Sequence, residues 1–189
     1  MPLRALPHLI TSFRLLCSPI AAWLLFQSRY RTALGVVFLA GISDWFDGFA
    51  ARRLRSSGHA GVVLDPLADK ILLVTLFVVL AIRGLIPAWM FWIALGRDLV
   101  IVIGALLVHV LRGIREFLPS TLGKVSTFFQ IMLILLTLCV AAFPYGVLLW
   151  LKYTALASSA FFTALSGLDY VRLGVEKCSP PQNRDRVIR

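Results

Sequence analysis

Long apolar runs separated by short polar stretches fill most of this chain. A membrane-spanning α-helix needs roughly 20 mostly apolar residues, and six runs meet that length. They cover residues 8–28, 33–52, 62–82, 86–111, 121–142 and 146–171. The pattern predicts an all-α membrane protein of six transmembrane helices over residues 1–173, with no separate soluble domain. Residues 174–189 are polar, and we expect them to form a flexible cytoplasmic tail.

The composition supports a membrane location. Hydrophobic residues make up 59% of the chain, charged residues make up 15%, and the mean hydropathy is +0.87. Soluble domains carry about a quarter charged residues. A soluble domain of this size could not bury so much apolar surface, so the sequence favours lipid as its solvent.

The net charge of +10 is interpreted as membrane orientation and not as nucleic-acid binding, because Lys and Arg are retained on the cytoplasmic side of membranes. With six spans, one side carries Arg4, Arg52, Arg53, Arg55, Arg112, Arg115, Lys124, Arg172, Lys177, Arg184, Arg186 and Arg189. The other side carries only Arg29, Arg31, Arg83 and Lys152. We therefore expect both termini in the cytoplasm, where the basic side would attract anionic lipids.

Four of the nine acidic residues fall within residues 44–69: Asp44, Asp47, Asp65 and Asp69. Positions three or four apart on a helix share one face, so two helices would each present a pair of carboxylates. Charge inside a bilayer costs several kcal/mol per group, and crowded carboxylates repel and tend to take up protons. Hard divalent cations such as Mg²⁺ or Mn²⁺ would compensate them. A two-metal site of this kind stabilises the attacking and leaving oxygens in phosphoryl displacement.

Each aspartate alone has a simpler interpretation. An Asp near a helix end is usually a cap or a solvated group, and Asp65 directly before Pro66 resembles a helix start. Four carboxylates in an acid-poor chain favour the metal site. Gly48 and Gly61 would mark tight helix packing if they stood alone. Beside the carboxylates we interpret them as the wall of a nucleotide pocket, because glycine lets a ligand approach the backbone closely.

The segment 44–69 resembles, without a gap, the D-x2-D-G-x2-A-R-x8-G-x3-D-x3-D signature of the CDP-alcohol phosphatidyltransferase family. The matching positions are Asp44, Asp47, Gly48, Ala51, Arg52, Gly61, Asp65 and Asp69. The resemblance implies a six-helix bundle that transfers a phosphatidyl group from CDP-diacylglycerol to an alcohol with release of CMP. It also implies a homodimer whose site opens to the cytosol.

The resemblance also implies roles for these residues. Asp44, Asp47 and Asp65 would bind two divalent cations, and Asp69 would lie near the metals and act as general base on the acceptor hydroxyl. The CDP moiety would be bound by Asp44, Gly48, Ala51, Arg52 and Gly61.

Two further segments bear on the acceptor alcohol. Residues 7–14 resemble the P-N-x-x-T-x-x-R start of the phosphatidylglycerophosphate synthase and cardiolipin synthase branches, with His8 in place of Asn. Gly96-Arg97-Asp98 resembles the G-R-[DE] pattern of both branches. A buried Arg in a membrane needs an anionic partner, either Asp98 or another helix's carboxylate, or else an acceptor phosphate. In the second interpretation Lys124 and Arg115 complete a basic pocket.

The motifs of this chain match the phosphatidylglycerophosphate synthase branch and the cardiolipin synthase branch about equally well. Residues 102–109 depart from the S-A-L-R-E-W run of phosphatidylglycerophosphate synthases, and Gly123-Lys124 opens a G-K-x-x-T-x-x-Q pattern found in both branches. We favour glycerol 3-phosphate as the acceptor, with phosphatidylglycerol, and thus cardiolipin synthesis, as the alternative. A divalent-cation transporter is the rival of another class, although transporters more often spread acidic residues along a pathway. We expect a multi-pass protein of a bacterial inner membrane whose active site faces the cytoplasm and whose partners are CDP-diacylglycerol, the alcohol acceptor and membrane lipids.

Overall fold

A computed structural model describes residues 6–54, 61–112 and 121–178, and these residues form six α-helices with no strand among them. The helices are α1 (Leu6–Phe26), α2 (Tyr30–Leu54), α3 (Gly61–Ile82), α4 (Ala88–Arg112), α5 (Thr121–Ala142) and α6 (Gly146–Cys178). The predicted all-helical architecture is confirmed, and the predicted bounds of α5 agree at both ends. α6 continues through residues 174–178, which the sequence assigned to the tail. Glu176 and Lys177 favour helix, so polarity there does not end it.

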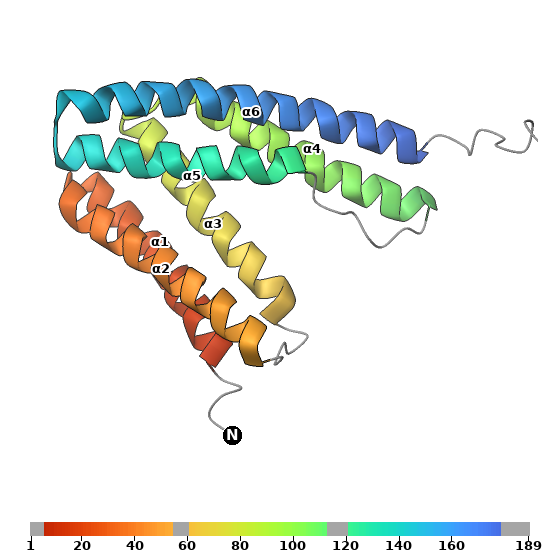
Figure 1. Cartoon of the computed structure of the whole chain (residues 1–189), viewed down its shortest axis with the longest axis horizontal. Helices are drawn as coiled ribbons and strands as arrows, with labels where there is room; N and C mark the ends of the chain where they lie inside the picture. Colours follow the sequence, from red (N-terminus) through yellow and green to blue (C-terminus); the bar gives the residue numbers. More distant parts are fainter. Residues whose placement is uncertain (1–5, 55–60, 113–120, 179–189) are drawn as a thin grey trace, which may run out of the picture.

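The six helices form two groups, α1 to α3 and α4 to α6 (Figure 1). In the first group α1 packs against both α2 and α3, and in the second α6 packs against both α4 and α5. Contacts of α2 with α5, and of α3 with α4 and α5, join the groups. Figure 1 shows the groups meeting near the short turns and diverging toward the ends of α2 and α3 that carry the aspartate motif.

The three short turns, between α1 and α2, α3 and α4, and α5 and α6, lie together at one end, called the turn end below (Figure 1). The Arg31 Nε donates to the carbonyl oxygen of Ala142 at 3.3 Å. The Lys152 Nζ donates to the carbonyl oxygen of Leu85 at 2.7 Å. Each bond ties one turn to another. Because the helices alternate in direction, the motif in residues 44–69 belongs to the opposite end.

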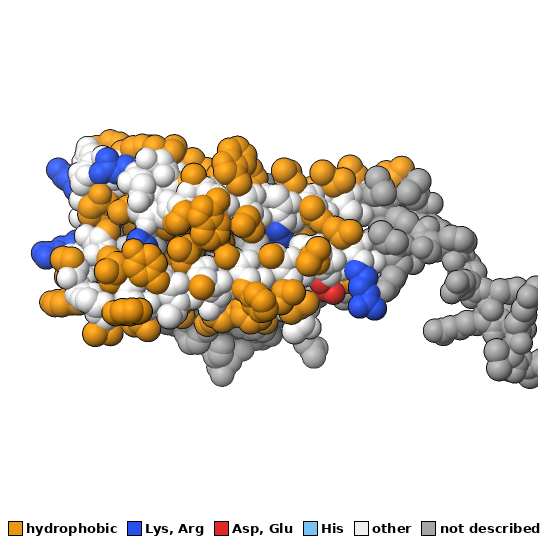
Figure 2. Space-filling view, turned by 90° about the horizontal axis from the view of Figure 1, so that it is seen from above, with side chains coloured by type: hydrophobic (Ala, Val, Ile, Leu, Met, Phe, Trp, Pro, Cys, Tyr) orange, Lys and Arg blue, Asp and Glu red, His pale blue; other side chains and the backbone are white. Residues whose placement is uncertain are grey.

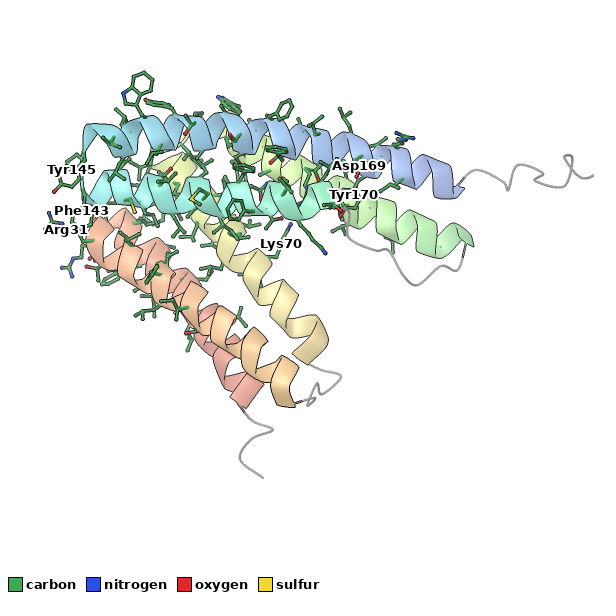
Figure 3. All side chains as sticks on the ribbon, viewed as in Figure 1. Arg31, Lys70, Phe143, Tyr145, Asp169 and Tyr170 are labelled. Atoms are coloured by element: carbon green, nitrogen blue, oxygen red, sulfur yellow. The ribbon has the colours of Figure 1, made fainter. Side chains whose placement is uncertain are left out.

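Four basic residues lie in or beside these three turns: Arg29, Arg31, Arg83 and Lys152. They are the residues that the six-span arrangement assigned to the side of the membrane with few basic residues. Figure 2 shows Lys and Arg side chains gathered at the turn end. In Figure 3, Arg31 lies there beside Phe143 and Tyr145, and its guanidinium carbon is 5.1 Å from the centre of the Phe143 ring. A cation beside aromatic rings is typical of a membrane–water interface.

Apolar side chains occur both inside the bundle and on its outer surface. Leu80, Met90 and Leu138 are fully buried, whereas Trp150 is 77% exposed and Val147 72% exposed. Within the described residues, α5 and the part of α6 up to Leu173 are long and apolar enough to cross a bilayer. Only 17% of the apolar stretch of α6 is buried in the protein. A long apolar helix whose surface is mostly not buried in protein is typical of a membrane-spanning segment.

Candidate active site

The structure places the whole motif on two consecutive helices. The last turns of α2 carry Asp44, Asp47, Gly48, Ala51 and Arg52, and the first turns of α3 carry Gly61, Asp65 and Asp69. The side chains of these residues lie outside the part of the chain that the structure describes, so their role in metal and CDP binding stays a prediction. Each aspartate pair lies within one continuous helix, which the same-face spacing requires.

Asp65 is not a helix cap. α3 begins at Gly61, and its first turn contains no acidic residue. The apolar residues 62–64 extend the helix upstream, so Asp65 lies one turn inside it. The simpler interpretation of Asp65 as a helix start is therefore wrong.

A chain of charged side chains begins one residue beyond the motif. The Nζ of Lys70 on α3 lies 2.5 Å from Oδ1 of Asp98 on α4, and Nη1 of Arg97 lies 3.0 Å from the same oxygen. Two cations share one carboxylate, so the cluster keeps one positive formal charge. Figure 3 shows Lys70 where α3 approaches α5.

Arg97 connects three helices of the second group. It is 8% exposed and is the one charged side chain among the buried residues that the structure describes. From α4, its Nε donates to the Ser166 hydroxyl of α6 at 3.2 Å, and its Nη2 donates to the Gly123 carbonyl of α5 at 3.0 Å. Its guanidinium carbon also lies 5.7 Å from the centre of the Tyr170 ring. Of the anionic partners that the sequence left open for Arg97, the structure shows Asp98, and the binding of an acceptor phosphate by Arg97 stays a prediction.

Gly123 allows the side chains of Arg97 and Tyr170 to lie close to the backbone of α5. A Cβ atom at this position would lie 2.9 Å from the Arg97 Nη2 and 2.9 Å from the Tyr170 hydroxyl oxygen. Real Cβ atoms essentially never make contacts this short, so only glycine lets both side chains reach the α5 backbone without displacement. The next residue, Lys124, is exposed. Arg115, the third candidate for acceptor binding, lies outside the described residues.

The sequence reasoning missed the contribution of α6. Its Thr163 and Ser166 are fully buried. Thr163 shares a hydrogen bond of 3.0 Å with Ser126 and accepts one of 3.2 Å from the Nε2 of Gln130. These two residues and Tyr170 recur at three- and four-residue intervals, which places them on one helix face. That spacing of polar residues in an apolar helix could have predicted a polar contact between α5 and α6.

Comparison with known proteins identifies the family. The model of the CDP-alcohol phosphatidyltransferase family matches residues 4–164. The chain belongs to this family. The matched range contains the aspartate motif, the Lys70–Asp98–Arg97 cluster and Lys124.

Two branches of enzymes appear among its relatives. The chain is 29% identical to the cardiolipin synthase (CMP-forming) of Rattus norvegicus and 30% identical to that of Homo sapiens, and each alignment covers 89% of this chain and 61% of the relative. It is 33% identical to the CDP-diacylglycerol–glycerol-3-phosphate 3-phosphatidyltransferase of Aquifex aeolicus (strain VF5), over 65% of this chain and 69% of the relative. The chain thus spans 61% of the length of the two cardiolipin synthases.

The first prediction concerns Gly123. In Gly123→Ala the new methyl group displaces Arg97 or Tyr170, and we expect this variant to be less stable than Gly96→Ala by about 1–3 kcal/mol, the usual cost of overpacking. Thermal unfolding in detergent measures the change. Gly96→Ala is the matched control, because no atom lies within 4 Å of a Cβ built there and Ala is a better helix former than Gly. Equal stability of the two variants would contradict the close approach of Arg97 to Gly123.

Proposed function

We propose that this family member transfers a phosphatidyl group from CDP-diacylglycerol to a glycerol-type hydroxyl and releases CMP. The observation that carries the proposal is the cluster of Lys70, Asp98 and Arg97. It links the helix of Asp69, the predicted base, to the helices of the predicted acceptor-phosphate residues. The relatives named as CMP-forming synthases support the same chemistry, and the family assignment favours a transferase over a cation transporter.

The donor set fits a pair of divalent cations. Asp44, Asp47, Asp65 and Asp69 offer only carboxylate oxygens, which suit Mg²⁺ and Mn²⁺, and they come from two helices joined by the short link of residues 55–60. When bound, such ions would supply positive charge beside the diphosphate of the donor.

The reaction then needs one proton transfer and one displacement at phosphorus. Asp69 takes the proton of the acceptor hydroxyl, and that oxygen bonds to the β-phosphorus of CDP-diacylglycerol. The bond between this phosphorus and the bridging oxygen breaks, and CMP leaves with the bridging oxygen. Arg52 offers a planar fork of donors that suits a phosphate group.

The acceptor's own phosphate would be bound by Arg97, Lys124 and Arg115. The excess positive charge of the Lys70–Asp98–Arg97 cluster attracts an anion, because charge is weakly screened in an apolar surrounding. Glycerol 3-phosphate, which the sequence favours, and phosphatidylglycerol both carry a phosphate near a free hydroxyl. The relatives include both kinds of synthase, so both acceptors belong to the proposal at this point.

The proposal includes the membrane arrangement. All six helices cross the membrane, both termini are cytoplasmic, and the motif lies at the cytoplasmic interface. The alternating helices and the separation of Arg29, Arg31, Arg83 and Lys152 at the turn end support this orientation. A homodimer and a bacterial inner membrane stay predictions.

The second prediction tests the reaction. Purified protein should release CMP from CDP-diacylglycerol when a glycerol-type acceptor and Mg²⁺ or Mn²⁺ are present, and EDTA should stop the release. Asp69→Asn should lower turnover by about 10²–10⁴-fold, the usual contribution of a general base, while much of the CDP-diacylglycerol binding remains. The matched control is Asp169→Asn on α6, outside the motif. Full activity of Asp69→Asn would overturn the assignment of the base.

The third prediction separates acceptor binding from structure. Lys124 is exposed, so Lys124→Ala should leave the unfolding temperature unchanged. It should raise the KM of a phosphate-containing acceptor about tenfold, the scale of one charge-assisted hydrogen bond of 1.5–3 kcal/mol, without changing the KM of CDP-diacylglycerol. Steady-state kinetics with each substrate varied in turn measures this. Equal increases of both KM values would remove Lys124 from the acceptor site.

The fourth prediction tests the orientation. Single cysteines replace Gln27 and Tyr145 at the turn end, and Ser56 in the link between α2 and α3, in a chain whose native cysteines are changed to Ala. A membrane-impermeant maleimide should label Gln27→Cys and Tyr145→Cys from one side of the membrane and Ser56→Cys from the other. Labelling of all three from the same side would refute the six-span arrangement.

A further inference from the structure

A groove of about 220 Å³ lies between α3, α4 and α5, directly beside the Lys70–Asp98 ion pair. Its apolar walls include Leu73 and Phe77 of α3, and Phe91 and Ala94 of α4. We propose that this groove holds an acyl chain of the acceptor, so that the acceptor is itself a phospholipid of the phosphatidylglycerol type. The inference rests on the proposed function and names the substrate class of the same site.

The groove has the polarity of a lipid. Lys70 and Asp98 lie at one end of it, and Phe77 and Phe91 lie seven residues away along their helices, toward the turn end. α3 runs toward the turn end and α4 runs back from it, so the two charged residues share an end and the two phenylalanines share the other. Seven residues of helix span about 10 Å at 1.5 Å per residue. The charged end would lie beside a headgroup, and the apolar length beyond it fits part of an acyl chain.

The walls are formed by well-packed side chains. Phe77 is 3% exposed and Ala94 is 5% exposed. Neighbouring residues therefore hold both side chains in place, and neither can move to fill the groove. Membrane lipid is as apolar as these walls, which means that transferring an acyl chain from the bilayer to the groove gains little free energy. The groove therefore acts by fixing where the chain and its headgroup lie, and its effect should appear as positioning of the reacting hydroxyl.

The position of the groove favours the acceptor over the donor. The residues predicted to bind CDP lie on α2 and at the start of α3, and none of the described lining residues comes from α1 or α2. The charged end of the groove is Asp98, which binds the Arg97 guanidinium at 3.0 Å. Arg97 is a predicted ligand of the acceptor phosphate, and Lys70 follows the predicted base in the sequence. Glycerol 3-phosphate has no chain to occupy such a groove.

The experiment compares acceptors that share a headgroup. Phosphatidylglycerol carries acyl chains, whereas glycerophosphoglycerol is the same headgroup without them. For the wild-type enzyme we expect kcat/KM with phosphatidylglycerol to exceed that with glycerophosphoglycerol and with glycerol 3-phosphate by about 10- to 100-fold, the scale of a small change in the position of reacting groups. Ala94→Phe fills the groove and should remove this preference while the KM of CDP-diacylglycerol stays the same.

Two further variants keep the result interpretable. Val102→Phe adds the same ring to an exposed position of α4, where the native Val102 is 63% exposed, and should behave as the wild type. Val74→Phe fills the groove from α3 and replaces Ala94→Phe if that variant does not fold. Equal use of phosphatidylglycerol and glycerophosphoglycerol by the wild type would overturn the inference. A rise in the KM of CDP-diacylglycerol alone would also overturn it, by assigning the groove to the donor.

A binding measurement separates this inference from the proposed function. Phosphatidylglycerol with a photoreactive group in the middle of an acyl chain should crosslink to peptides of α3 and α4 that contain Phe77 and Ala94, and Ala94→Phe should abolish the crosslink. The absence of CMP release with every acceptor would refute the proposed function, while the crosslink would still report on the groove. Crosslinking spread evenly over the outer helix faces would refute the groove.

Discussion

The buried guanidinium of Arg97 is the constraint on which the second helix group depends. An Arg in an apolar bundle must place its N–H donors on acceptors, because an unpaired buried charge is strongly destabilising. Here the acceptors come from three helices: Asp98 on its own helix, the Gly123 carbonyl on α5 and Ser166 on α6. The requirement to satisfy one side chain therefore sets how closely α4, α5 and α6 approach, and it explains why position 123 has no side chain.

The same charge cluster connects the two helix groups. The Asp98 carboxylate forms ion pairs with both Arg97 and Lys70, so an ion pair joins α3 to α4. Elsewhere the groups diverge toward the motif (Figure 1), so this ion pair is a connection between the helix of the predicted base and the helices of the predicted acceptor pocket. Ionic contacts of this kind are stronger in an apolar surrounding than in water. A catalytic site assembled from two helix groups needs such a connection, because a small displacement of reacting groups lowers the rate greatly.

The apolar groove follows from the same geometry. α3 and α4 are held together by charge at Lys70 and Asp98, and the residues toward the turn end leave a space lined by Leu73, Phe77 and Ala94. A protein in lipid gains little free energy from burying apolar surface against lipid. A groove of this kind would therefore act by orienting a substrate chain and not by binding it tightly. The charged cluster and the groove together form one amphipathic site, in which a phosphate and an acyl chain of the same molecule would be placed at once.

The sequence by itself determined the helices and the aspartate motif that two of them carry, and metal and CDP binding by the motif stays a prediction. Helix bounds could be predicted because spanning segments must be long, apolar and ended by polar turns, and the motif in residues 44–69 has many fixed positions. The sequence also identified Arg97 and its neighbour Asp98. Only the tertiary structure decided the partners of Arg97 on α5 and α6, the ion pair of Lys70 and the groove beside it. These depend on which helix faces meet, and residues such as Gly123 and Ser166, which lie far apart in the chain, carry no local signal of that meeting.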